Sequence, residues 1–225
     1  MKWPRGGSWE TIEAMHRVVH MMLRPPMKLG LAFLVMAIGV WPAVMAQSTP
    51  TWDTARVWTD FEAASQRPEL VLRLDLTRQK WKQVDHRLRR FRQLRELTLD
   101  RNKLDSLPSW FGELATLEHL SIRSNTLTSI PECLLQLDSL RVLDLSDNMI
   151  EGIPEDIDAL AALERLILWS NVVGHFPPSL SQLERLVELD LLNNEMSVDE
   201  QIWVRELLPG RTLSFSPPCR CQFDD

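Results

Sequence analysis

The chain has 225 residues, of which 25 are Lys or Arg and 31 are Asp or Glu, so its formal net charge is −6. This length suffices for one domain with a continuous core. The acidic balance disfavours nucleic acids and anionic membrane surfaces as partners, because both repel a negatively charged protein.

The N-terminal segment 1–46 contains a predicted export signal. Residues 1–26 show no sustained hydrophobic period. Residues 27–46 begin with Met-Lys, continue through an apolar run and end in small residues. This order predicts a secretory signal peptide that is cleaved after Ala46. Residues 1–26 are then either an artefact of an upstream start, with Met27 as the natural start, or an unusually long leading region.

A retained membrane anchor is the alternative interpretation of this segment. The apolar stretch Leu29–Ala46 is short for a transmembrane helix even when Trp41 and Pro42 are counted in it. No cysteine directly follows the apolar run, so the modification that makes a bacterial lipoprotein is not available. We therefore expect an exported chain, periplasmic or extracellular, that begins at Gln47. Cleavage removes five basic and two acidic residues, which takes the net charge from −6 to −9.

Residues 47–70 are expected to form an N-terminal helical cap. Apolar side chains recur at every third position within Thr51–Ser65, and Asp53 can cap the first turn, which predicts a short helix. The aromatic side chains of this helix either stack on a ligand or form a hydrophobic lid over the segment that follows. We favour the lid, because the following segment is a repeat array, and an array needs an atypical end unit.

Residues 71–196 repeat one pattern at a constant spacing, in copies that start at positions 71, 94, 117, 140, 163 and 186. In the clearest copy, Leu140–Ala162, Leu or Ile stands at places 1, 4, 6, 11, 14, 18 and 21, Asn at place 9 and Pro at place 15. The first copy, Val71–Gln93, and the last copy are degenerate. Four close copies at one spacing are too regular for ordinary amphipathic helices, and they predict stacked coils.

Each coil is expected to contribute one strand to a parallel sheet. The apolar pair at places 4 and 6 has the period of two that a strand requires, with both side chains inward. At place 9 the chain leaves the strand, and a buried Asn can bond the backbone of its own turn and of the next coil. Proline at place 15 marks the turn into the convex side, and the apolar pair at places 18 and 21 closes the coil. The predicted ladder of structural asparagines consists of Asn102, Asn125, Asn148, Asn171 and Asn194.

A run of five arginines lies near the end of the first coil, within HRLRRFRQLR at residues 86–95. Such a run suggests a nucleic-acid patch. However, Leu88, Phe91 and Leu94 occupy core places of the pattern. We therefore interpret the arginines as the solvent side of a convex turn, in keeping with the acidic chain.

Residues 197–225 are expected to close the array as a C-terminal cap and tail. Val198–Leu208 has the pattern of a helix, which the following Pro-Gly pair ends. Its apolar stripe consists of Ile202, Val204 or Arg205, and Leu208. Thr212–Phe215 can form a final edge strand, and the Ser-Pro-Pro segment after it prevents continuation.

The sequence contains no convincing catalytic or metal-binding constellation. It has no G-x-S-x-G, no H-E-x-x-H, no phosphate-binding glycine loop and no dinucleotide fingerprint. His119 and His175 are far apart in coil position. Cys133 falls on the convex side of the third coil, and a bridge between Cys219 and Cys221, or between two chains, stays open but would be strained. We expect no catalysis, no cofactor and no metal.

Places 3, 5 and 7 of each coil are expected to face outward on the concave side of the sheet. The first half of this face is polar and mixed in charge, whereas the second half groups apolar side chains beside arginine. Such a patch is typical of a partner-binding surface, unless Trp169 packs flat on its own sheet or against the closing cap. The predicted partner-binding residues are Arg123, Val142, Asp144, Arg165, Ile167, Trp169, Asp190 and Leu192.

The stretch Val71–Met196 resembles the leucine-rich repeat family, in the form that carries L-P-x-x-L-x-x-L, as in LPSWFGEL at Leu107–Leu114. The segments LRLDLTRQKWKQV and VRELLPGRTLSF are similar to short secreted bacterial members. The resemblance implies an α/β solenoid: a right-handed superhelix with a parallel concave sheet and a short helical or irregular convex side. It is specific for the fold and weak for function, because the family supplies protein-binding scaffolds to many systems.

We expect a non-catalytic, exported module that grips a protein partner with its concave sheet, binds no nucleic acid and keeps no stable membrane span after cleavage. One alternative is a structural envelope protein that self-associates through a solenoid end or through the cysteine tail. Another is an effector such as a ubiquitin ligase, which would need a further catalytic domain with a nucleophilic cysteine.

Overall fold

The computed structural model of the chain describes residues 55–218. The predicted signal peptide, the first residues of the predicted cap helix and the two tail cysteines lie outside the described residues.

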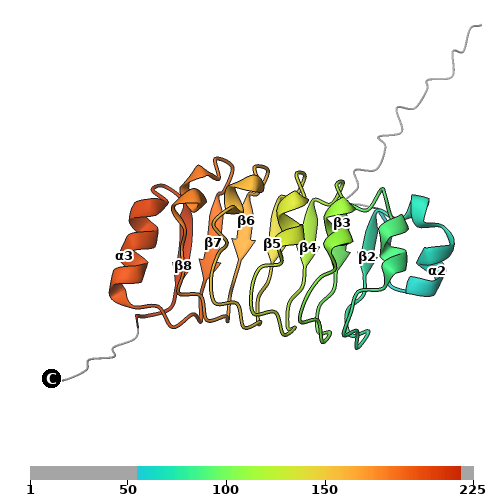
Figure 1. Cartoon of the computed structure of the whole chain (residues 1–225), viewed down its shortest axis with the longest axis horizontal. Coiled ribbons are helices and arrows are strands. Elements are labelled where there is room, and N and C mark those ends of the chain that lie inside the picture. Colours follow the sequence, from blue (N-terminus) through green and yellow to red (C-terminus); the bar gives the residue numbers. More distant parts are fainter. Residues whose placement is uncertain (1–54, 219–225) are drawn as a thin grey trace, which may run out of the picture. The chain divides into compact units, whose positions relative to one another are not determined.

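The described residues form an open sheet of eight parallel strands whose spatial order is their order in the sequence (Figure 1). The strands are β1 (Val57–Trp58), β2 (Arg73–Asp75), β3 (Glu96–Thr98), β4 (His119–Ser121), β5 (Val142–Asp144), β6 (Arg165–Ile167), β7 (Glu188–Leu191) and β8 (Thr212–Phe215). From β2 to β7, residues at the same place of neighbouring coils lie opposite each other, as Leu97 lies opposite Leu120. The predicted stack of equal coils is therefore confirmed, and the fold is an α/β solenoid.

Short helical turns form the layer opposite the sheet. They are α2 (Phe61–Gln66), η2 (Pro68–Leu70), η3 (His86–Arg90), η4 (Ser109–Glu113), η5 (Glu132–Gln136), η6 (Ile157–Ala159), η7 (Pro178–Gln182) and the longer α3 (Val198–Leu207). Pro108, Pro131 and Pro177 directly precede η4, η5 and η7 in extended conformation, as expected of a proline that starts a turn. The η turns are short, so each coil can close and return to the sheet within one repeat.

The core is a continuous spine of aliphatic side chains between the sheet and the turns. Leu97 and Leu99, at places 4 and 6 of the second coil, have no exposed surface, and neither does Phe111 on η4. Burying one such side chain contributes about 1.5–3 kcal/mol to folding. Since each coil exposes its apolar edges until a neighbour covers them, this stability comes from stacking and not from single coils.

The asparagine at place 9 binds two coils together. The Asn125 Nδ2 group donates to the carbonyls of Leu99 in the preceding coil (3.1 Å) and of Ile122 (3.2 Å) and Arg123 (3.0 Å) in its own coil. Its Oδ1 accepts from the Leu104 amide at 3.0 Å. The other four predicted asparagines make equivalent bonds. The first coil has Gln79 at this place, and its side chain is exposed.

The residue before each asparagine adopts a left-handed backbone conformation. Place 8 has a φ between 52° and 61° in all six coils although none of the six residues is glycine. These residues are Arg78, Arg101, Ser124, Asp147, Ser170 and Asn193. A left-handed residue reverses the chain sharply, so it turns the backbone out of the strand and brings the next side chain, the asparagine, inward.

The N-terminal end differs from the prediction. The expected helix over Thr51–Ser65 begins only at Phe61, because the Asp60 carboxylate caps it by accepting from the amides of the second and third helical positions, at 2.9 and 3.1 Å. Val57 and Trp58, expected within the helix, form β1 and extend the sheet beside β2.

Of the aromatic side chains expected to cover the first coil, Phe61 contacts it. This side chain is buried, and its ring centroid lies 5.1 Å from that of Trp81 and 6.1 Å from that of Phe91. Both partners belong to the first coil. The cap helix α2 therefore packs its aromatic residue on the end of the array.

At the C-terminal end the predicted helix and edge strand are present as α3 and β8. Ser197 and Glu200 form a capping box that starts α3. The expected apolar stripe through Ile202 is wrong: Ile202 is 46% exposed, whereas Gln201 is buried and its Nε2 donates to the Ser216 carbonyl at 3.0 Å. One hydrogen bond thus places a polar residue on the inner side of the helix. None of the helices within residues 55–218 is both long and apolar enough to cross a membrane.

We predict that Asn125→Ala lowers the free energy of unfolding by about 2–4 kcal/mol, because it leaves a buried amide and buried carbonyls without partners. Gln79→Ala, at the same place of the first coil, is the control and should change stability by less than about 0.5 kcal/mol. Urea denaturation followed by circular dichroism measures both. Equal losses in the two variants would contradict a special role for the buried amide.

Candidate binding surface on the concave sheet

The outward side chains of β3–β6 line a hollow of about 280 Å³ on the concave face. Because successive residues of a strand point to opposite faces, these are the residues at places 3 and 5 of four neighbouring coils. The side chains that line it are Glu96, Thr98, His119, Ser121, Val142, Asp144, Arg165 and Ile167. Four of them, Val142, Asp144, Arg165 and Ile167, belong to the set predicted from the sequence.

Val142 and Ile167 form the apolar part of this hollow. Val142 lies opposite Arg165 and Asp144 lies opposite Ile167 in the register of β5 and β6, so the two aliphatic residues are diagonal neighbours. Both are half-buried. A partner that covers them would remove apolar surface from water, and this is the main favourable contribution to most protein association.

Charged side chains flank the hollow in pairs. Arg73 makes a bidentate contact with Glu96, with Nε–Oε2 2.8 Å and Nη2–Oε1 3.1 Å, on the N-terminal side. On the C-terminal side, Arg165 Nε lies 2.6 Å from Glu188 Oε2. Each pair joins residues at the same place of adjacent strands. The charges at the rim are therefore largely balanced within the protein, which leaves shape and apolar contact to select a partner.

His119, on β4, also lines the hollow. Burial lowers the pKa of its imidazole, although Glu96 and Glu118 nearby favour the charged form. The side chain is therefore neutral at pH 7, with one ring nitrogen as a donor and the other as an acceptor. His119 and Glu96 were not among the predicted binding residues. Their position in the same column as Val142 and Arg165 is the sequence signal that identifies them.

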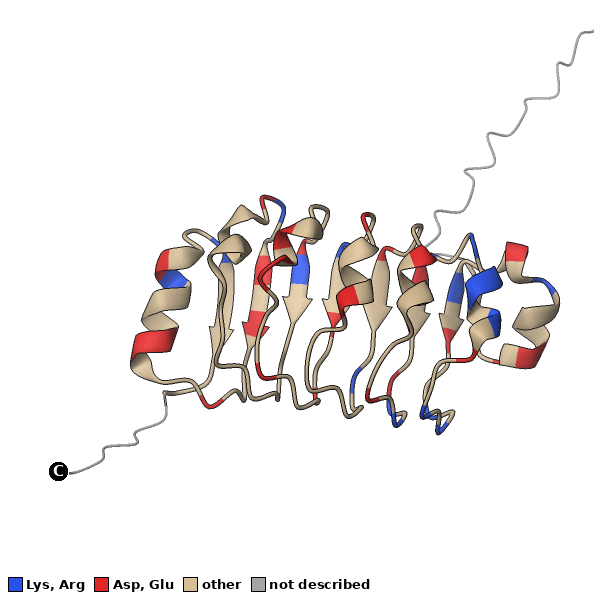
Figure 2. Ribbon diagram, viewed as in Figure 1, with Lys and Arg blue, Asp and Glu red and all other residues tan. Residues whose placement is uncertain are grey.

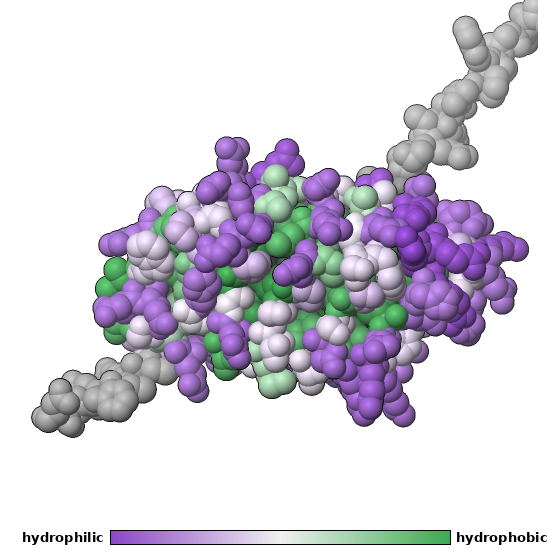
Figure 3. Space-filling model, in the orientation of Figure 1, coloured by the Kyte–Doolittle hydropathy of each residue, from purple (hydrophilic) through white to green (hydrophobic). Residues whose placement is uncertain are grey.

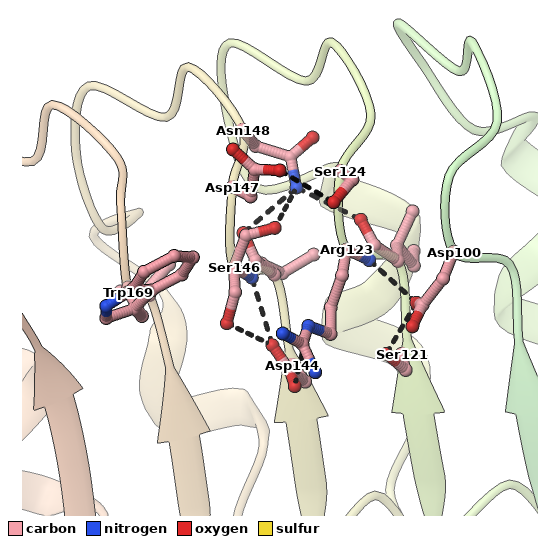
Figure 4. A network of polar contacts seen from close by, with 12 residues as sticks. Asp100, Ser121, Arg123, Ser124, Asp144, Ser146, Asp147, Asn148 and Trp169 are labelled. Carbon is pink, nitrogen blue, oxygen red and sulfur yellow. Dashed lines mark hydrogen bonds and ion pairs between the residues drawn. The ribbon is translucent and has the colours of Figure 1, made fainter.

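Beyond the hollow, toward the C-terminal ends of the strands, a polar network joins three coils (Figure 4). Asp100 Oδ1 accepts from Ser121 Oγ at 2.6 Å and from the Arg123 amide at 2.9 Å. Arg123 Nε lies 3.7 Å from Asp144 Oδ2. Burial raises the pKa of Asp100, and this effect is larger than the opposite effect of its two hydrogen bonds. The network fixes the backbone that presents Arg123 to solvent.

The remaining predicted residues lie outside the hollow. Trp169 is half-buried, stands beside the polar network in Figure 4, and its carbonyl accepts from the Asp147 amide at 2.8 Å. Leu192 is 37% exposed, and its amide donates to Asp190 Oδ1 at 3.0 Å. The predicted site is thus divided: four residues line the hollow, and Arg123, Trp169, Asp190 and Leu192 lie outside it.

The arginine-rich turn has carboxylate partners. Arg87 contacts both Asp85 and Glu62 at 2.8 Å, and Arg89 forms an ion pair with Glu113. The three core places of the turn are fully buried. In Figure 2 the blue residues of this turn lie beside red residues of the neighbouring helical turns. The arrangement is that of a solvated convex surface rather than of an uncompensated basic patch.

Within residues 55–218 no three His, Cys, Asp or Glu side chains gather as they would around a metal ion. Burial raises the pKa of the free Cys133 thiol to about 11, so it is protonated at neutral pH and a poor nucleophile. His175 Nε2 lies 2.9 Å from Oε1 of the exposed Glu155. His175 is remote from His119 in sequence and in coil position.

A family model described as leucine rich repeat matches residues 92–150. This match covers the second coil, the third and the start of the fourth. No curated protein matches the sequence.

Solved structures share the fold. A leucine-rich repeat protein of Leptospira interrogans is 27% identical with a TM-score of 0.57, over 73% of this chain and 49% of that one. The leucine-rich repeat ectodomain of a membrane receptor kinase from Arabidopsis thaliana, in complex with Casparian strip integrity factor 2, is 28% identical with a TM-score of 0.51, over 67% and 20%. Internalin C2 of Listeria monocytogenes, at 20% identity and a TM-score of 0.56 over 70% and 66%, shows the fold alone. The chain spans about half or less of the first two proteins.

We predict that Asp100→Asn raises the melting temperature at pH 7. The pKa of Asp100 is raised by folding, so its contribution to stability is full below the unfolded-state pKa and is lost as the pH rises through the folded-state pKa. Both hydrogen bonds reach Oδ1, which an asparagine carbonyl can replace. The two proteins should converge below about pH 3.5. A lower melting temperature for the variant at pH 7 would mean that attraction to Arg123 outweighs the cost of burial.

Proposed function

Because the chain is a leucine-rich repeat protein, we propose that it is a non-catalytic binding module that grips a protein partner with its concave sheet. The leucine-rich repeat fold commonly mediates protein–protein binding, and its curved array offers an extended concave surface for this purpose.

One observation carries the proposal. The hollow over β3–β6 combines diagonal aliphatic neighbours, Val142 and Ile167, with a neutral imidazole and with ion pairs at its rim. Apolar centres surrounded by polar rims are the usual anatomy of protein interfaces. Trp169, on the same coil as Ile167, and Leu192, on the next coil, supply further apolar surface.

The charge of the molecule favours a protein over a nucleic acid. The chain has a formal net charge of −6 and a sequence pI of about 5.4. Phosphate binding depends on uncompensated Lys and Arg. The arginine-rich turn directs Arg87 and Arg89 to carboxylates, which supports a partner recognised by side chains rather than by a phosphate backbone.

We propose that the leader sequence directs this module out of the cytoplasm. The basic start, apolar run and small residues of residues 27–46 support export with cleavage after Ala46. We predict that sequencing the N-terminus of the protein purified from its native compartment gives Gln47 as the first residue. A chain that retains the apolar run would favour a membrane anchor instead.

The binding proposal is tested by capture with the full chain from the native compartment, followed by mass spectrometry and titration of the purified partner. Ile167→Asp and Trp169→Asp each place a charge in the proposed contact and should weaken binding by about thirtyfold or more. Val187→Asp is the control, since Val187 is 57% exposed but lies outside places 3, 5 and 7. Equal binding by all three variants would exclude the concave face as the site.

A further inference from the structure

The two ends of the described solenoid differ in character. At the N-terminal end, α2 turns Phe61 and Ala64 inward and exposes polar residues, among them Glu62, which pairs with Arg87. The edge strand there, β1, has only two residues. Figure 3 shows dense hydrophilic colour over this end. A repeat array requires such a polar outer face on its last unit to stay soluble.

The C-terminal end has an uncharged strand at its edge. β8 reads TLSF and pairs with β7, and the Thr212 amide donates to the Val187 carbonyl at 2.8 Å. Because backbone groups alternate along a strand, the N–H and C=O groups of Leu213 and Phe215 point away from β7. Natural edge strands are usually protected by charge, proline, a bulge or a cover, and β8 has no charge, proline or bulge within its four residues.

The helix beside this strand adds apolar surface to the same end. Val198, Ile202 and Arg205 are spaced by four and three positions and therefore share one side of α3. The Arg205 guanidinium lies over the Phe215 ring at 4.7 Å, so this side of α3 is turned toward the β8 end. Val198 is 53% and Ile202 46% exposed, and in Figure 3 apolar colour reaches this end of the molecule.

We propose that a second copy of this chain docks on the C-terminal end, β8 against β8, about a twofold axis that passes midway between the two Ser214 residues. A twofold axis makes two identical edges antiparallel and matches Leu213 of each copy with Phe215 of the other. These are the residues whose backbone groups point outward, so each matched pair exchanges two hydrogen bonds and the interface gains four. The Val198–Ile202 stripes of the two α3 helices flank the joined strands and bury each other.

Self-complementarity argues for a second copy rather than an unrelated partner. The outward groups of Leu213 and Phe215 are evenly placed about Ser214, so the edge is its own complement. No charged residue lies on β8 to repel an identical strand. The dimer leaves both concave hollows uncovered, so this inference is independent of the proposed function and would make the protein bivalent toward a partner.

The test is the molar mass of the full chain, measured by size-exclusion chromatography with light scattering over a range of concentrations, with and without reductant. We expect a dimer that dissociates on dilution and is unaffected by reductant. Thr212→Lys places a charge on the exposed edge, and Ile202→Glu places one on the flanking stripe. Each should weaken dimerisation at least tenfold, while circular dichroism melting shows that both variants remain folded.

Met149→Glu is the matched control, because Met149 is 49% exposed and lies on a different coil, away from this end. Its dimerisation should equal that of the wild type. A monomer at every concentration, or a dimer that both end variants retain, would overturn the proposal. A dimer lost on adding reductant would overturn it as well and would assign association to the cysteines.

Discussion

The structure depends on the hydrogen bonds that each place-9 asparagine makes to two coils at once. Asn125 reaches a carbonyl of the coil before it and two carbonyls of its own coil while accepting an amide from the turn that follows the previous asparagine. This geometry is satisfied only when neighbouring coils hold their strands and turns in the same register. The asparagines therefore keep the turns of successive coils aligned, and the left-handed residue at place 8 is the local strain that brings the asparagine inward.

The repeat constrains the residues that face the core, whereas the residues that face outward can differ from coil to coil. Places 4, 6 and 9 must match between coils, but places 3, 5 and 7 only share a position on the concave face. Along place 3 the chain changes from Glu96 through His119 and Val142 to Arg165, one residue per strand. A regular scaffold thus presents an irregular surface, and the hollow arises where small and aliphatic side chains interrupt the paired charges.

The sequence predicted the structural features that recur in every repeat. The strands, the inward leucines and the turns after proline recur at one spacing, so each copy supports the interpretation of the others. The sequence did not predict features that occur once. The start of α2 depends on Asp60 and not on the apolar spacing, and Gln201 faces inward because the Ser216 carbonyl lies within its reach. His119 stands in the same column as Val142 and Arg165, but which members of that column line the hollow depends on side-chain size across four strands, so the column alone did not select it.

The ion pairs of the concave face affect partner binding more than they affect the stability of the solenoid. An exposed pair contributes little, about 0–1 kcal/mol, so pairs such as Arg165–Glu188 do not hold the solenoid together. They instead neutralise each other beside the hollow, so that a partner need not bring matching charges to approach Val142 and Ile167. If the partner's contact were mainly ionic, binding would weaken steeply with added salt. A hollow bounded by internally paired charges argues for binding that depends on buried apolar area and changes little with ionic strength.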